Sequence, residues 1–408
     1  MKILGFIVSS PREIDFYKKI WEKNYFENFD IIVDDHIDRH NSIEGYRLTM
    51  SILDNIKNEN ADFSRKHVNI VMLSQTISDN VHVRGGGGYF IVVATKDFNK
   101  WSRVYQRKSL RKYLGKLVAK LNASLISSRG FISGYNTQSL NIHSPNQLGI
   151  HRVMFPRGID LSNKEPEDSS ISFFNHFFCH GRFDSKIYSS ETPHDTTIIG
   201  YPRYDGFRRQ CNESRAELDK EFDLSPNKPY VIWMSGQYET STRLWMDALL
   251  PLLSRFNVIC RPHPKQTAQN PRLINQLSEK GYKVDAVTSR SLVNLYSAAD
   301  FVLADWGDSI FGSLYCGVKT IMLNLEPYDA SRDRHGLKKI VRNNLPNFNP
   351  DHESCLEMKN IMEDKVQWPR LERQVDEIAN DLFGKRQGRS VETVLAALKE
   401  MKQEHKAT

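Results

Sequence analysis

The stretch Val258-Ile-Cys-Arg-Pro-His-Pro-Lys265 places a short apolar run directly before a loop of basic and proline residues. A run of this kind predicts a buried strand, and the two prolines stiffen the loop that follows it. In open α/β sheets, ligands bind outside the carboxyl ends of the strands. The pattern therefore predicts an anion site after this strand, where Arg261 and His263 stabilise negative charge.

Strand and helix patterns alternate on both sides of this stretch, which predicts βαβ units and a parallel sheet. The predicted strands are Tyr230–Met234, Asn257–Cys260, Lys283–Val287, Phe301–Leu303 and Thr320–Leu323. The predicted helices are Arg243–Phe256, Pro271–Lys280, Ser291–Ala298 and Ser309–Cys316. We therefore expect a doubly wound domain over residues 216–385.

The length of 408 residues exceeds what one hydrophobic core usually spans, so we expect a second domain, over residues 1–215. Its predicted strands are Ile3–Val8, Phe29–Val33, Val68–Leu73, Tyr89–Val93 and Ser172–Cys179. The alternation loosens between about Ser139 and Ser170. The predicted fold is α/β, with two Rossmann-like doubly wound domains and a cleft between them.

Residues 386–408 are predicted to form a C-terminal helix and tail. The helix starts at Ser390, and its apolar residues fall on one stripe. These residues are Val391, Val394, Leu395, Leu398 and Met401.

A second strand end lies in Asp300-Phe-Val-Leu-Ala-Asp-Trp-Gly-Asp-Ser-Ile-Phe-Gly-Ser313. The strand ends at Asp305, and a helix opens near Ser309, where free backbone N–H groups and the helix dipole favour phosphate. The hydroxyls of Ser309 and Ser313 add hydrogen-bond donors. Asp305 or Asp308 could instead be a plain helix cap.

Two further strand ends precede the predicted domain boundary. The segment Phe177-Phe-Cys-His-Gly-Arg-Phe-Asp-Ser-Lys186 leads into a His-Gly loop, in which His180 suits a general base for a hydroxyl. A purely structural histidine fits this pattern about as well. The segment Ile198-Ile-Gly-Tyr-Pro-Arg-Tyr-Asp205 is expected to place Arg203 in the cleft.

The composition excludes several classes of protein. The five cysteines form no CxxC pair, which argues against a zinc knuckle or a redox motif. No window approaches the roughly 18 apolar residues that span a bilayer. We expect a cytoplasmic protein, with any membrane contact peripheral and on the inner face.

The net charge of +7 is concentrated in Lys96–Leu121, which has nine basic residues and one acid. A basic amphipathic helix can lie on an anionic membrane surface or meet an anionic acceptor. An ordinary helix with a solvated basic face explains the pattern equally well. Nucleic acid is not an expected partner, because no recognition motif accompanies the charge.

Four motifs together carry a resemblance to a known family. They are His180-Gly181, Gly200-Tyr-Pro-Arg203, Arg261-Pro-His-Pro264, and Asp305 with Ser309-Ile-Phe311. In this order they resemble the CDP-glycerol glycerophosphotransferase family of teichoic-acid synthesis and, more broadly, GT-B glycosyltransferases. The resemblance covers about Phe177–Leu323. The Asp305 turn is one residue longer than the family pattern, and the His180 loop lacks the usual preceding tryptophan.

The resemblance implies a transferase of capsule or teichoic-acid-like polymer synthesis in the cell envelope. It would move a glycerol-phosphate or sugar group from a cytidine-nucleotide donor to a hydroxyl of a polymer or lipid-linked acceptor. The acceptor would enter from the N-terminal domain, and the C-terminal domain would bind the donor. His180 and His263 would be catalytic, without a metal or a further cofactor. The expected donor-binding residues are Arg261, Pro264, Lys265, Asp305, Ser309, Ser313, Ser235 and Gly236.

Three alternatives stay open at this point. A CMP-Kdo or CMP-sialic acid glycosyltransferase would use a carboxylate as the base or nucleophile, and Asp34 and Asp35 are the candidates. A UDP-sugar 2-epimerase would need carboxylates as acid and base in the cleft. A non-catalytic nucleotide-sugar-binding protein would keep the fold without the reaction.

Overall fold

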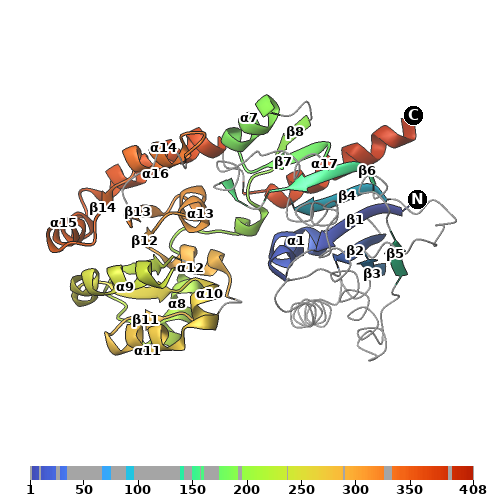
Figure 1. The fold of residues 1–408 in the computed structure, drawn as a ribbon. Coiled ribbons are helices and arrows are strands. Elements are labelled where there is room, and N and C mark those ends of the chain that lie inside the picture. Colours follow the sequence, from blue (N-terminus) through green and yellow to red (C-terminus); the bar gives the residue numbers. More distant parts are fainter. Residues whose placement is uncertain are drawn as a thin grey trace, which may run out of the picture.

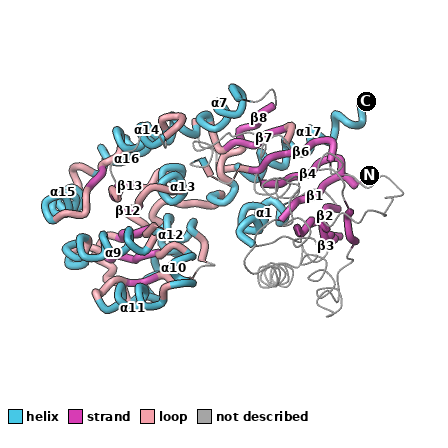
Figure 2. The backbone as a smooth tube through the Cα atoms, viewed as in Figure 1, coloured by secondary structure: helices cyan, strands magenta, loops and turns pink. Residues whose placement is uncertain are grey.

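The computed structural model describes fourteen segments of the chain. They are residues 2–8, 11–23, 28–34, 67–74, 89–95, 138–141, 149–156, 158–159, 174–191, 195–236, 238–287, 290–325, 333–384 and 388–407. These segments form two separate sheets, each with its own covering helices, joined by a linker near the middle of Figure 1. Figure 2 shows the strands of the two sheets as two magenta groups.

The N-terminal sheet has eight described strands in the order β5-β3-β2-β1-β4-β6-β7-β8, and all neighbours pair in parallel. They are β1 (Lys2–Val8), β2 (Asn28–Asp34), β3 (His67–Ser74), β4 (Tyr89–Thr95), β5 (Gln138–Asn141), β6 (Gly149–Phe155), β7 (His176–Cys179) and β8 (Asp195–Ile198). Within residues 1–198, the described helices that accompany them are α1 (Pro11–Lys23) and α7 (Arg182–Glu191). Helix α1 packs on β1 because Tyr17 and Trp21, one turn apart, place their ring centroids 5.3 and 6.0 Å from Phe6.

The C-terminal sheet has six described strands in the order β11-β10-β9-β12-β13-β14, again all parallel. They are β9 (Tyr230–Met234), β10 (Asn257–Arg261), β11 (Lys283–Val284), β12 (Phe301–Ala304), β13 (Lys319–Leu323) and β14 (Asn347–Phe348). The helices are α8 (Asn212–Phe222), α9 (Glu239–Ala248), α10 (Pro264–Gln269), α11 (Pro271–Glu279), α12 (Leu292–Ala298), α13 (Asp308–Cys316), α14 (Leu337–Asn344), α15 (His352–Glu363) and α16 (Trp368–Phe383). Strands β9, β10, β12 and β13 are buried along their whole length, as expected for a sheet covered on both faces.

The strand order reverses beside the first strand of each sheet, which is the doubly wound pattern. In the C-terminal sheet this switch point lies between β9 and β12. The register pairs Met234 with both Arg261 and Ala304. The loops that begin at Ser235 and Asp305 therefore leave the same edge of the sheet from adjacent strands, where α/β proteins bind ligands.

Helix α17 (Ser390–Ala407) returns to the N-terminal domain and packs against α1 and β4, so both chain ends lie on that domain in Figure 1. The predicted apolar stripe of this helix is confirmed. Its five residues, Val391, Val394, Leu395, Leu398 and Met401, are buried in the same cluster as β1 and α1.

The linker 199–211 carries the chain from one sheet to the other, and α8 after it already packs on α12 of the C-terminal domain. The linker contains a short 3-10 turn, η2 (Pro202–Tyr204). Lys19 of α1 donates hydrogen bonds to the carbonyl oxygens of Arg203 and Asp205. The Asp205 carboxylate accepts from the backbone N–H groups of Ser390 (3.1 Å) and Val391 (2.7 Å). The linker is therefore held by both ends of the chain.

Several elements differ from the sequence prediction; strand β11, for example, covers only Lys283–Val284 of the predicted Lys283–Val287. The segment 139–170, predicted as irregular, contains β6, a central strand between β4 and β7. Its apolar run is short because His151 and Arg152 interrupt it, and in the fold only Val153, Met154 and Phe155 of this strand are buried among the residues whose burial is described. The predicted helix Arg243–Phe256 is α9 followed by a 3-10 turn, η3 (Leu250–Ser254), because Pro251 has no N–H to continue the helix.

Replacing Asp205 with alanine should destabilise the protein by about 2 kcal/mol, because two N–H groups at the start of α17 lose their acceptor. Urea unfolding measures this change. The exposed Asp195→Ala provides the control and should stay within about 0.5 kcal/mol of the parent. Equal effects of the two substitutions would contradict a capping role of Asp205.

Candidate functional site

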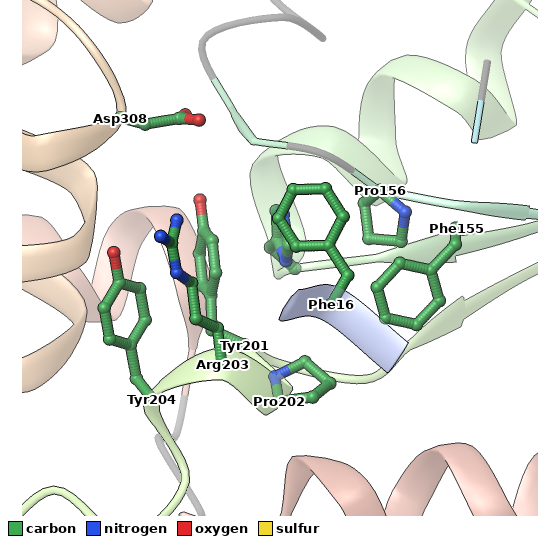
Figure 3. A pocket seen from close by; sticks show the side chains of 9 residues that line it. Phe16, Phe155, Pro156, Tyr201, Pro202, Arg203, Tyr204 and Asp308 are labelled. Atoms are coloured by element: carbon green, nitrogen blue, oxygen red, sulfur yellow. The ribbon is translucent and has the colours of Figure 1, made fainter. Parts of the chain in front are cut away.

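A small pocket, with a cavity volume of about 10 Å³, lies between the two domains. The N-terminal domain and the linker provide most of its wall, and the C-terminal domain contributes one acid at the start of α13 (Figure 3). The lining residues are Phe16, Phe155, Pro156, His180, Tyr201, Pro202, Arg203, Tyr204 and Asp308. The pocket thus brings together the predicted His180 and Arg203.

His180 follows β7 and is 3% exposed. Its Nδ1 lies 3.0 Å from the carbonyl oxygen of Gly200, and because a carbonyl only accepts, Nδ1 carries the proton. Its Nε2 is buried and has no hydrogen-bond partner among the described residues. Burial lowers the pKa of His180 to about 3, partly opposed by the bond to Gly200. The imidazole is therefore neutral near pH 7, with its basic nitrogen unoccupied.

The ring of Tyr201 lies parallel to that of His180, with centroids 3.4 Å apart and planes 6° apart. Sequence analysis did not single out Tyr201, although it lies inside the quoted Gly-Tyr-Pro-Arg motif. The Gly-Tyr-Pro-Arg motif was the available sequence signal for Tyr201. In the fold, both Gly200 and Tyr201 of this motif contact His180.

Asp184 is a second buried group that sequence analysis missed. Its carboxylate accepts from the backbone N–H groups of His180 (2.7 Å) and Gly181 (2.8 Å), which fixes the His-Gly loop at the start of α7. Burial raises the pKa of Asp184 to about 6, although these N–H groups oppose the shift. An acid in the first turn of a helix was the available signal.

Gly181 is required by close packing. A Cβ atom at this position would lie 2.3 Å from the Cα of Phe383, at the end of α16. The glycine of the His-Gly motif therefore allows a helix of the C-terminal half to approach the loop that carries His180.

The His263 loop lies at the end of β10 and is not part of the pocket wall. Nδ1 of His263 accepts from the backbone N–H of Lys265 at 3.1 Å and caps α10. In neutral His263 the proton is consequently on Nε2, which acts as a donor. Pro264 and Lys265 are exposed.

Arg261 is buried, and its guanidinium contacts the segment that follows β11. Its Nη1 donates to the Asp285 carboxylate at 2.8 Å and to the carbonyl oxygen of Val287. Asp285 also pairs with Arg290 at 3.0 Å. In this structure Arg261 therefore holds the loop after β11, and its predicted contact with a diphosphate stays a prediction.

Asp305, Ser235 and Gly236 meet at the switch point of the C-terminal sheet. The Asp305 carboxylate accepts from Ser241 Oγ at 2.7 Å, and a Cβ atom at Gly236 would lie 1.9 Å from its Oδ2. Burial raises the pKa of Asp305 to about 6, although Ser241 opposes the shift. Ser235 is buried beside this group.

The start of α13 differs from the predicted phosphate site in two respects. Ser313 is fully buried, and its hydroxyl bonds the Ile310 carbonyl (2.8 Å) and Thr320 Oγ1 (2.9 Å), so it does not face a ligand. The first residue of the helix is the acidic Asp308, which reaches Gly158 of the N-terminal domain. Ser309 is half-buried, and its carbonyl accepts from Tyr296 at 3.0 Å.

Some predictions fall outside the described residues. These are Asp35, the side chain of Asp34 at the end of β2, and the basic segment Lys96–Leu121. Within the described part of the chain, no helix is long and apolar enough to cross a membrane. The same residues contain no group of histidine, cysteine and acidic side chains placed to hold a metal ion.

Comparison with known proteins shows the fold. No family model and no curated protein matches the sequence. Among solved structures, a histidine-to-asparagine variant of the wall teichoic acid polymerase TagF is similar, with a TM-score of 0.52 and 14% identity over 99% of this chain and 90% of that chain. The same variant soaked with CDPG is similar with a TM-score of 0.51 and 15% identity over 99% of this chain and 89% of that chain. Anabaena HepE in complex with UDP is also similar, with a TM-score of 0.50 and 13% identity over 99% of this chain and 100% of that chain. These likenesses and the two sheets confirm the predicted two-domain, Rossmann-like fold of GT-B type.

Asp305→Asn should change the pH dependence of stability. The pKa of Asp305 rises from 3.8 to about 6 on folding, so its contribution to stability is complete below the unfolded value and is lost as the pH rises through 6. From about pH 4 to about pH 8, the variant should gain up to about 3 kcal/mol relative to the parent in urea unfolding. The exposed Asp381→Asn is the control, and a constant difference between Asp305→Asn and the parent would contradict the shift.

Proposed function

We propose that the chain transfers a group from a nucleotide-activated donor to a hydroxyl acceptor, as a GT-B-type transferase of surface-polymer synthesis. The observation that carries the proposal is the unoccupied Nε2 of a neutral, buried His180 in the pocket between the domains. A general base needs a lone pair within reach of the proton that it takes, and Nε2 is the ring nitrogen of His180 that makes no hydrogen bond within the described residues. The fold shared with TagF along nearly the whole chain supports this class of reaction.

In the proposed step, the acceptor hydroxyl lies in the pocket and gives its proton to His180 Nε2. The acceptor oxygen forms a bond to the transferred group, while the bond from that group to the nucleotide phosphate breaks. The leaving nucleotide keeps the electron pair. The guanidinium of Arg203, in the same pocket wall, is placed to stabilise negative charge.

The donor would bind at the carboxyl edge of the C-terminal sheet. Ser235 and Gly236 begin the loop after β9, and Asp305 ends β12, so they share the switch point. The Nε2–H of His263 and the ammonium of Lys265 provide donors for phosphate oxygens. The pair of Arg261 with Asp285, at 2.8 Å, joins the end of β10 to the segment after β11 at this edge.

Cytidine is the nucleotide that we propose for the donor, on the strength of the four motifs that span Phe177–Leu323. The solved neighbours support a nucleotide ligand in general, since one was soaked with CDPG and another holds UDP. The transferred group would be glycerol phosphate or a sugar, and the acceptor a polymer or lipid-linked hydroxyl. The proposed peripheral contact with an anionic membrane depends on Lys96–Leu121.

A 2-epimerase is the second candidate, and the described pocket favours transfer over it. An epimerase of the kind considered above needs two carboxylates beside the sugar, whereas Asp308 is the one acid among the described lining residues. A non-catalytic binding protein would bind the donor nucleotide but would not transfer a group to a hydroxyl acceptor.

Nucleotide titration by calorimetry tests the donor. We expect CDP or CMP to bind at least about tenfold more tightly than UDP, which corresponds to about 1.4 kcal/mol. Tighter binding of UDP than of both cytidine nucleotides would exclude the proposed donor and favour the epimerase.

His180→Asn should abolish transfer while donor binding is kept. Loss of a general base lowers kcat by about 100-fold or more, whereas the KM for the donor should change little because His180 lies apart from the loops after β9 and β10. A suitable assay follows nucleotide release with a hydroxyl acceptor. Arg255→Ala, at an exposed residue of the C-terminal domain, is the control. Full activity of His180→Asn would remove His180 from the mechanism.

A further inference from the structure

We propose that Tyr201 is a positioning residue for His180, and that its ring face stabilises the imidazolium formed when His180 takes the acceptor proton. This role rests on the proposed function, because it assigns a purpose to the base of that reaction. The two rings come from different parts of the fold, His180 from the end of β7 and Tyr201 from the linker.

The geometry of the pair is unusual for two neutral rings. Their centroids are 3.4 Å apart and their planes differ by 6°, which is a face-to-face stack. Neutral aromatic pairs prefer offset or edge-to-face arrangements, because two negative ring faces repel each other. A cation within about 6 Å of a tyrosine face is attracted to it instead. The ring face of Tyr201 therefore favours the charged form of His180, in opposition to the burial that keeps the imidazole neutral at rest.

This preference is the one that catalysis needs. His180 is neutral before the reaction and becomes charged only as the acceptor proton arrives at Nε2. In that step the acceptor oxygen bonds to the transferred group, the nucleotide leaves with the electron pair of the broken bond, and the proton stays on Nε2. An interaction that strengthens as the imidazolium forms lowers the barrier, because it acts in the transition state more than in the ground state.

Tyr201 is itself held from both domains, so its plane is fixed. Its hydroxyl accepts from the backbone N–H of Ile159 at 3.3 Å. On the other side, its ring centroid lies 5.1 Å from that of Tyr315 in α13 and 5.6 Å from that of Phe383 in α16. Gly200, the residue before Tyr201, accepts from His180 Nδ1 at 3.0 Å. The same two linker residues therefore set the tautomer and the plane of the base.

A fluorination series at position 201 tests the role of the ring face. The series starts from Tyr201→Phe and replaces that phenylalanine with its mono-, di- and trifluorinated forms, which reduces the negative charge of the ring face with little change in shape. We expect kcat to fall stepwise, by about tenfold over the series. The KM for the donor should stay within about twofold, because donor binding does not require a charged His180.

The matched control is the same series at position 188. Tyr188 is also buried and stacks on Phe177, with centroids 4.9 Å apart and planes 16° apart, but no charge develops there. Its series should show no trend in kcat. A flat series at position 201, with His180→Asn inactive, would overturn the positioning role alone. Full activity of His180→Asn would instead overturn the proposed function.

Discussion

The turn at Gly200 is the constraint on which the site depends. Gly200 has φ +73°, and a Cβ atom there would lie 2.5 Å from Ser390 Oγ and 2.6 Å from Tyr315 Oη. Only glycine fits both the conformation and the space. The turn presents the Gly200 carbonyl to His180, places Tyr201 against the imidazole, and allows Asp205 to reach the start of α17. The base, the pocket wall and the return of the last helix thus share one short segment.

The buried ionisable groups differ in what they do. Asp285 forms ion pairs with Arg261 and Arg290, and these pairs hold loops together, which is a structural role. His180 and Asp305 have no such ionic partner among the described residues, and burial lowers the pKa of His180 to about 3 and raises the pKa of Asp305 to about 6. Each lies at the carboxyl end of a parallel strand, one per domain. Shifted groups at ligand-binding strand ends are the pattern expected of a functional site.

The sequence predicted those parts of the structure that depend on local patterns. Continuous apolar runs located β9 to the residue and β10, β12 and β13 to within one residue at each end, because parallel strands are buried on both faces. The stripe on α17 predicted its buried face, although not the domain on which it packs. Strand β6 was not predicted, because its first half is only partly buried and has no continuous apolar run. The same apolar runs predicted where the strands end, and therefore predicted that His180 and Asp305 lie at strand ends.

Contacts between distant segments were beyond local patterns. Asp205 meets Ser390 across 185 positions, and Arg261 meets Asp285 across 24, so neither spacing marks a motif. From the sequence, Arg261 was a basic residue in a loop and Ser313 a hydroxyl in a helix start. Their side-chain directions depend on neighbours that only the folded chain provides. Burial of Ser313 between Ile310 and Thr320 is one such case.

Hydrogen bonds to the backbone also give the two histidines opposite tautomers, which the sequence did not distinguish. His180 donates from Nδ1 to Gly200, which leaves Nε2 as a base. His263 accepts at Nδ1 from Lys265, which makes Nε2 a donor. A proton acceptor suits the hydroxyl that must lose its proton, and a donor suits phosphate oxygens that must hold charge. Each assignment follows from one backbone group, so the local turn, rather than the identity of the residue, decides which histidine takes the proton.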